Sequence, residues 1–102
     1  MGEGGTPLIR VYNLGLMLGC PNLFIKDERQ CPTASFKDRQ AAVTIAALKE
    51  AGITEMVAAS TGNVAISYSA YAARAGINRK LYTLSVNEHG QTVRVPVTVY
   101  TL

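Results

Sequence analysis

The sequence lacks the features that mark several large classes of protein. It has no run of basic residues, because its 10 Lys and Arg residues are scattered along the chain together with 7 Asp and Glu residues. A nucleic-acid-binding surface is therefore not expected. No uninterrupted apolar segment is long enough to span a membrane, and residues 1–10 contain no basic region leading into an apolar stretch. We expect a cytoplasmic protein that binds neither nucleic acid nor a membrane.

Residues that commonly bind metals are also scarce. The two cysteines, Cys20 and Cys31, do not form a CxxC pair, and the single histidine, His89, lies far from both in the sequence. This spacing gives little support to a metal site, and none is expected. We interpret both cysteines as reduced thiols that pack as small apolar residues, and His89 as a solvated loop residue.

The remaining composition is that of a globular protein, with 102 residues, enough for one domain with a modest core. An apolar run at residues 23–26 predicts a buried strand, and helical spacing of apolar side chains predicts a helix over 36–51. A second apolar strand at 55–60 precedes a helix over 63–75 that ends before Gly76. This order predicts an α/β fold, with a partial parallel sheet and crossover helices.

The helix expected over residues 63–75 carries a single charge, Arg74, and is otherwise apolar, small or hydroxyl-bearing on every face. Such a pattern predicts a helix that is buried on all sides. A chain of this length can scarcely enclose one, so we expect it to associate or to belong to a larger structure.

Residues 78–102 have a different pattern from the preceding residues 1–77. Apolar and polar residues alternate on both sides of the EHG segment at 88–90, which predicts a C-terminal β-hairpin. The exposed edges of a hairpin favour pairing with another chain, including a homo-oligomer. Gly90 is the only glycine after Gly76, so this part of the chain cannot build a glycine-rich phosphate cradle.

The segment PTASFKDR, residues 32–39, places Lys37 in the first turn of a predicted helix. Ser35 is a natural N-cap, and Asp38 three residues later completes an approximate capping box. The positive end of a helix disfavours an ammonium group, which favours the neutral amine that a Schiff-base lysine requires. The alternative interpretation is a solvated lysine with its stem on the surface.

The segment STGN, residues 60–63, joins the second predicted strand to the second helix. Gly62 permits a tight turn with positive φ, and the backbone N–H groups that follow point out of the helix start. Side chains of Ser60, Thr61 and Asn63 add further donors. The segment predicts a site for a carboxylate or phosphate at the carboxyl end of a strand, where open α/β sheets bind ligands. An ordinary cap on a βα turn is the alternative.

Four segments in order carry a family resemblance: GEGGTPL at 2–8, LFIKDE at 23–28, PTASFKDR at 32–39 and ASTGNVAISYSAYAARAG at 59–76. Together they resemble the N-terminal part of fold-type II pyridoxal-phosphate enzymes, the tryptophan synthase beta-like superfamily, and within it the threonine synthases. Four ordered motifs are much more specific than any one of them.

The resemblance implies pyridoxal 5′-phosphate as the cofactor and a small amino acid as the substrate. Lys37 matches the catalytic Schiff-base lysine, which serves as nucleophile and base. Phe36 and Asp38 match flanking positions that seat this lysine, and Thr6 belongs to a motif near the site entrance. Asn63 matches the asparagine that hydrogen-bonds the 3′-oxygen of the cofactor.

The resemblance also implies that Ser60, Thr61 and Gly62, together with Asn63, hold the α-carboxylate of the substrate. The SFKDR sequence favours threonine synthase, which converts O-phosphohomoserine and water into threonine and phosphate. A threonine or serine dehydratase is one alternative, and a non-catalytic remnant that acts only in association is another.

The resemblance ends after Ile77. Members of the family continue with a glycine-rich loop for the cofactor phosphate and a polar residue facing the pyridine nitrogen, and neither has a counterpart here. We expect residues 1–77 to be the N-terminal part of the enzyme domain and residues 78–102 to be a tail outside it. We therefore expect the 102 residues alone to bind the cofactor weakly and to be inactive.

Overall fold

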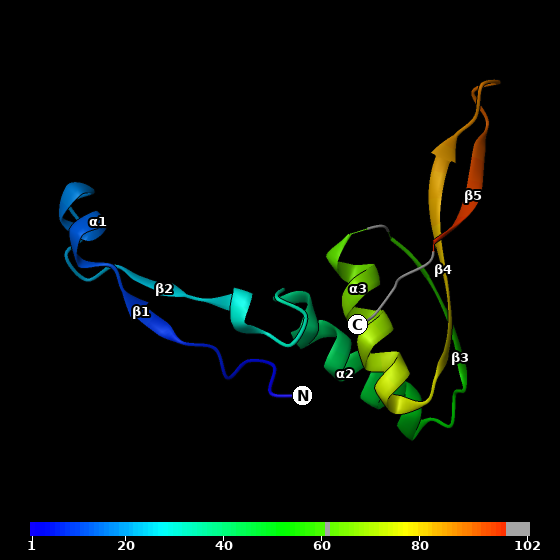
Figure 1. Ribbon diagram of the computed structural model, residues 1–102, viewed down its shortest axis with the longest axis horizontal. Helices are drawn as coiled ribbons and strands as arrows, with labels where there is room; N and C mark the ends of the chain where they lie inside the picture. Colours follow the sequence, from blue (N-terminus) through cyan, green and yellow to red (C-terminus); the bar gives the residue numbers. More distant parts are fainter. Residues whose placement is uncertain (61, 98–102) are drawn as a thin grey trace.

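The computed structural model describes residues 1–60 and 62–97, which form an N-terminal arm, a pair of helices and a three-stranded sheet (Figure 1). We call residues 8–26 the arm. The elements in chain order are β1 (Leu8–Arg10), α1 (Tyr12–Met17), β2 (Phe24–Lys26), the 3-10 helix η1 (Glu28–Gln30), α2 (Lys37–Glu50), β3 (Glu55–Ala59), α3 (Asn63–Ala75), β4 (Asn78–Val86) and β5 (Thr92–Val97).

The larger sheet has the strand order β3-β4-β5. Strands β3 and β4 are parallel, and α3 connects them. Their pairing begins with Glu55 opposite Asn78 and ends with Ala59 opposite Tyr82. Strands β4 and β5 form an antiparallel hairpin whose turn is closed by the Asn87 N–H donating to the Gln91 carbonyl at 2.9 Å. The expected α/β class, with a parallel crossover and a C-terminal hairpin, is confirmed. Strand β4 belongs to both pairings, so the hairpin continues the parallel sheet.

The strand expected at residues 23–26 does not join this sheet. Strand β2 pairs antiparallel with β1 in a separate two-stranded sheet. Its side chains are not buried either, since Phe24 is 49% exposed and Ile25 is 45% exposed. The prediction of a buried strand in the parallel sheet is therefore wrong. An apolar run does not specify its partner, and a strand closer in sequence is paired at lower cost in loop entropy.

The core lies between α2 and α3 and beneath the sheet. Its buried side chains are Ala41, Ile45, Tyr68, Tyr71, Ala72 and Ile77. The hydroxyl groups of Thr44 and Tyr68 lie 3.1 Å apart and form a hydrogen bond with each other at the boundary of this cluster. Gly76 ends α3 in the left-handed conformation (φ +74°), which glycine adopts without strain.

Helix α3 is buried on one side only. Ile66 is 41% exposed, and Ala73 and Arg74 are also exposed, whereas the side facing α2 and the sheet is covered. Within the described residues the helix is not enclosed, because a single neighbouring helix and one sheet face cover only part of its circumference. Burial of its remaining side by further protein stays a prediction. None of the helices in residues 1–60 and 62–97 has the length and apolar character needed to cross a membrane.

Candidate active site

Lys37 is the first residue of α2. Phe36 occupies the N-cap position, one residue after the predicted cap, although the Ser35 hydroxyl still accepts a hydrogen bond from the Lys37 N–H at 3.2 Å. The Asp38 N–H donates to the Ser35 carbonyl at 3.2 Å. The helix start expected from the sequence is therefore off by one residue, and Ser35 supports it by one hydrogen bond.

The side chain of Asp38 does not complete a capping box, so that part of the prediction is wrong. Asp38 is 0% exposed and accepts hydrogen bonds from the Thr33 N–H at 2.7 Å and the Thr33 hydroxyl at 2.5 Å. It also accepts one from the hydroxyl of Ser67 on α3. A buried carboxylate is tolerated only with such partners, and these draw Asp38 into the contact between the two helices.

The amine of Lys37 lies against an aromatic ring at the surface. Its Nζ is 5.0 Å from the centroid of the Phe36 ring, within range of a cation–π contact, and the side chain is half-buried. Phe36 itself is exposed. Lys37 forms no ion pair with any residue of the described ranges. Its amine is thus accessible and is not neutralised by a carboxylate.

A polar network joins three segments that are distant in the sequence, residues 2–8, 23–28 and 32–39. The Arg39 guanidinium makes two hydrogen bonds to the Glu28 carboxylate, at 2.8 and 2.7 Å. The Thr6 hydroxyl donates to the same carboxylate at 2.8 Å. Arg39, followed by Thr6, lowers the pKa of Glu28 to about 2. The network ties the N-terminal loop and η1 to the first turn of α2, directly after Lys37.

The described residues of the loop before α3 are accessible to solvent. Ser60 is half-buried, and its hydroxyl accepts the Gly62 N–H at 3.2 Å. Gly62 is the N-cap with φ −99° and ψ −151°, so the positive φ expected there is not found. Asn63 is exposed at the first position of the helix. The first N–H groups of α3 have no partner within the helix and can bind an anion. Thr61 lies outside the described residues.

The two groups of expected site residues lie at the same end of the helix pair. Helices α2 and α3 both begin on the side nearer the arm (Figure 1). Near these starts, Asp38 of α2 accepts a hydrogen bond from Ser67 of α3. Near the opposite ends, Lys49 of α2 and Ala75 of α3 line one hollow between the helices. The helices therefore run in the same direction, with Lys37 at one start and the 60–63 loop at the other.

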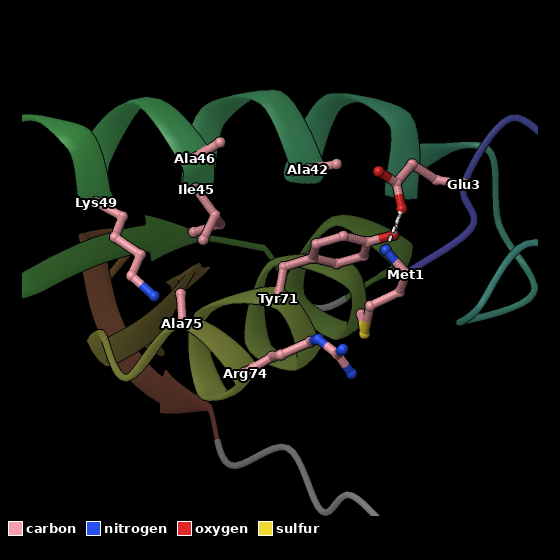
Figure 2. A pocket seen from close by; sticks show the side chains of 9 residues that line it. All are labelled: Met1, Glu3, Ala42, Ile45, Ala46, Lys49, Tyr71, Arg74 and Ala75. Carbon is pink, nitrogen blue, oxygen red and sulfur yellow. Dashed lines mark hydrogen bonds and ion pairs between the residues drawn. The ribbon is translucent and has the colours of Figure 1, made fainter.

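The hollow lies between α2 and α3 (Figure 2), and Lys37 is not among the residues that line it. At one end the Tyr71 hydroxyl donates to the Glu3 carboxylate at 2.7 Å. The N-terminal ammonium and the Tyr71 hydroxyl lower the pKa of Glu3 to about 2, and burial followed by Glu3 raises the pKa of Tyr71. These contacts attach the N-terminal residues to the helix pair.

Of the cysteines and the histidine, Cys31 contacts the polar network around Glu28. Both cysteines are free: Cys20 is exposed, and Cys31 is buried with its sulfur 3.4 Å from a Glu28 oxygen. Burial raises the pKa of Cys31. His89 is exposed in the hairpin turn. Within residues 1–60 and 62–97, no group of three or more His, Cys, Asp or Glu side chains is arranged to hold a metal ion.

Sequence reasoning missed Ser67 and Thr33 as partners of Asp38, and Glu28 as the partner of Arg39. Ser67 stands among small and apolar residues, where the sequence gives no sign that a hydroxyl has a charged partner 29 positions away. Glu28 and Arg39 are the last residues of the LFIKDE and PTASFKDR segments. The presence of an acidic residue in one motif and a basic residue in another was the signal that could have predicted this ion pair.

Comparison with known proteins identifies similar sequences. Residues 1–94 match the family described as pyridoxal-phosphate dependent enzyme. The chain is 47% identical over 74 residues to a threonine synthase of Methanocaldococcus jannaschii, covering 72% of this chain and 18% of the relative. It is 44% identical over 77 residues to a threonine synthase of Halalkalibacterium halodurans, covering 76% and 22%.

A threonine synthase of Mycobacterium tuberculosis is 47% identical over 75 residues, covering 74% of this chain and 21% of the relative. The chain thus spans about a fifth of the length of the curated relatives it matches. No solved structure gives a significant match.

Proposed function

Because the chain belongs to the family of pyridoxal-phosphate-dependent enzymes, we propose that it carries the lysine and the substrate-carboxylate loop of a threonine synthase. Such an enzyme converts O-phosphohomoserine and water into threonine and phosphate. The proposal is supported by the names of the relatives and by the position of Lys37 at the start of α2, where the next residue, Asp38, accepts a hydrogen bond from Ser67 in the second turn of α3. That position is the observation on which it chiefly rests.

The residues present fit this cofactor. A half-buried primary amine without an ionic partner in the described ranges is available for covalent attachment to a carbonyl group. Lys37 would hold the cofactor, with the Phe36 ring beside the amine and the Asn63 amide as a hydrogen-bond donor. When bound, pyridoxal phosphate supplies an electron sink that allows the α-carbon of an amino acid to lose a proton.

Substrate orientation would come from the 60–63 loop. The N–H groups at the start of α3 and the side chains of Ser60 and Thr61 would bind the α-carboxylate, since a helix start favours negative charge. With the carboxylate held there, the Lys37 amine, once the amino group of the substrate has released it from the cofactor, would act as the base that removes and returns the proton at the α-carbon. The same two elements therefore hold the substrate and move its proton.

We expect weak cofactor affinity for the 102 residues alone. Gly90, the only glycine after Gly76, lies in the hairpin turn, so a glycine-rich cradle for the cofactor phosphate is not present in this part of the sequence. The exposed apolar side chains of residues 8–26, such as Met17 at 83% exposed, favour a second candidate function, a non-catalytic remnant that acts only in association with other protein.

The visible absorption spectrum of the chain with added pyridoxal phosphate tests the proposal. A protein-bound band in the wild type and in Lys49→Arg, but not in Lys37→Arg, is expected. Equal spectra for all three would contradict a role for Lys37.

The substrate class is tested by product analysis. Phosphate release from O-phosphohomoserine would support a threonine synthase, and formation of a 2-oxo acid from threonine or serine would support a dehydratase. Association with other protein, measured as oligomer mass, without specific cofactor binding would support the non-catalytic remnant.

A further inference from the structure

The hydrogen bond between Asp38 and Ser67 joins α2 to α3 near the start of each helix. Both side chains are 0% exposed, and the residues are 29 positions apart in the sequence. A buried carboxylate loses the hydration that would otherwise stabilise it, so its hydrogen-bond donors determine where it can lie. Thr33 supplies two donors from the loop before α2, and Ser67 supplies the donor from α3.

The pair has a defined relation to the residues of the proposed site. Asp38 follows Lys37 directly, at the start of α2. Ser67 lies four residues after Asn63, and residues four apart lie on the same face of a helix, about one turn from each other. The bond therefore connects the backbone next to the amine with the face of α3 on which Asn63 lies.

We infer that Asp38 and Ser67 are positioning residues whose hydrogen bond sets the distance between the Lys37 amine and the 60–63 loop. The inference rests on the proposed function of Lys37. The amine and the carboxylate loop belong to different helices, so a proton can be moved at a bound α-carbon only if the two helix starts keep a fixed separation. A small displacement of a reactive group relative to the bound substrate greatly lowers the rate of the reaction.

Helix α3 offers a matched control for this inference. Ser69 lies on the same helix as Ser67 and is also 0% exposed, but its hydroxyl has no hydrogen-bond partner within the described residues. Ser67→Ala and Ser69→Ala remove the same atom from equally buried positions, and only the first removes a bond to Asp38. Asp38→Asn keeps the shape of the side chain and removes its charge, which gives a second route to weaken the pair.

Amide hydrogen exchange of the full chain measures the coupling without any cofactor. We expect exchange of the amides of residues 66–69, the first in α3 that are bonded within the helix, to accelerate roughly tenfold in Ser67→Ala, as for loss of one hydrogen bond to a charged group. Asp38→Asn should have the same effect in a weaker form. The last turn of α3 should keep its wild-type exchange, and Ser69→Ala should match the wild type throughout.

Trapping of pyridoxal phosphate by borohydride, with mass-spectrometric mapping, then measures the effect on the amine. The ratio of label on Lys37 to label on Lys49 should fall several-fold in Ser67→Ala and stay unchanged in Ser69→Ala, roughly the loss expected when a reactive group is misplaced. A structural defect spread over the chain would lower this ratio too, but it would also accelerate exchange in the last turn of α3, which the inference expects to be unchanged.

The outcomes separate the inference from the proposed function. Equal exchange at residues 66–69 in Ser67→Ala and Ser69→Ala, or equal acceleration along all of α3, would overturn the inference. So would an unchanged labelling ratio in Ser67→Ala when the wild type labels Lys37 preferentially. If exchange responds as expected but wild-type Lys37 is labelled no more than Lys49, the coupling is supported and the cofactor role of Lys37 fails.

Discussion

The helix pair and the N-terminal arm use opposite means to hold their shape. Between α2 and α3, side chains such as Ile45 and Tyr71 are 3% and 6% exposed. In the arm, most large apolar side chains face water, and Met17 is 83% exposed. The arm is held by backbone pairing of β1 with β2 and by polar contacts at its base, including the Lys26 amine donating to the Thr6 carbonyl. Packing thus stabilises one region, and hydrogen bonds fix the other.

The overall dimensions reflect this difference. The radius of gyration is 18.0 Å, whereas a compact domain of this length has roughly 13 Å. Figure 1 shows the arm extending away from the helix pair. Contiguous exposed apolar side chains are typical of a surface that packs on further protein. The residues of the proposed site lie on the packed region, and their geometry does not depend on burial of the arm.

The largest effect is expected from a substitution in the packed region. Ile45→Ala should lower the free energy of unfolding by about 3 kcal/mol, because it leaves a cavity between α2 and α3. Met17→Ala in the arm should change it by less than about 0.5 kcal/mol. Urea unfolding followed by circular dichroism measures both. Similar losses for the two variants would remove the distinction between the regions.

A smaller effect is expected at the contact between the regions. Arg39→Ala removes the two hydrogen bonds to Glu28 and so releases η1 and the arm from α2. Limited proteolysis should then cleave residues 8–30 faster than in the wild type, while the helix pair keeps its resistance. Arg29→Ala is the matched control, because Arg29 binds only its neighbour Asp27 in the described part of the chain. Equal cleavage of both variants would argue against the network as the attachment.

The same contact should depend on pH. Arg39 and then Thr6 lower the pKa of Glu28 from its ordinary 4.5 to about 2. A lowered pKa in the folded state means that this stabilisation is complete above about pH 4.5 and is lost as the pH falls toward 2. Protection of the arm from an acid-active protease should decline over this interval, and Glu28→Gln should show a weaker dependence. A decline confined to pH values above 5 would point to other groups.

The smallest effect is expected at Ser69. Its buried hydroxyl has no hydrogen-bond partner among the described residues, so Ser69→Ala should change the free energy of unfolding by less than about 0.5 kcal/mol, or raise it slightly. Chemical denaturation checks this value. A loss above about 1 kcal/mol would mean that the hydroxyl has a partner, and would remove it as a control for Ser67.

Local signals predicted much of the fold. The bounds of α3 follow from Gly62 and Gly76, and the hairpin follows from the alternation of apolar and polar residues around the turn at 88–90. The start of α2 was predicted to within one residue from Ser35. In each case the determining interactions lie within a few residues of one another in the chain.

The failures involve distant partners. The apolar run at 23–26 carries no information on which strand it pairs with, and it pairs with β1. Asp38 has the sequence position of a capping residue, but the hydroxyl of Ser67 competes for its carboxylate from another helix. For the candidate site, Lys37 and the 60–63 loop could be proposed from the sequence. The bond that connects their helices could not, because it exists only after α2 and α3 have packed.

The central claim is that the start of α2 carries the amine that holds the cofactor. Mapping of the lysines labelled by pyridoxal phosphate and borohydride tests it most directly, because covalent trapping detects weak binding as well. The chain has four lysines, Lys26, Lys37, Lys49 and Lys80, so each serves as an internal control for the others. The account predicts that Lys37 is labelled first and most completely. Even labelling of all four, or preference for another lysine, would contradict it.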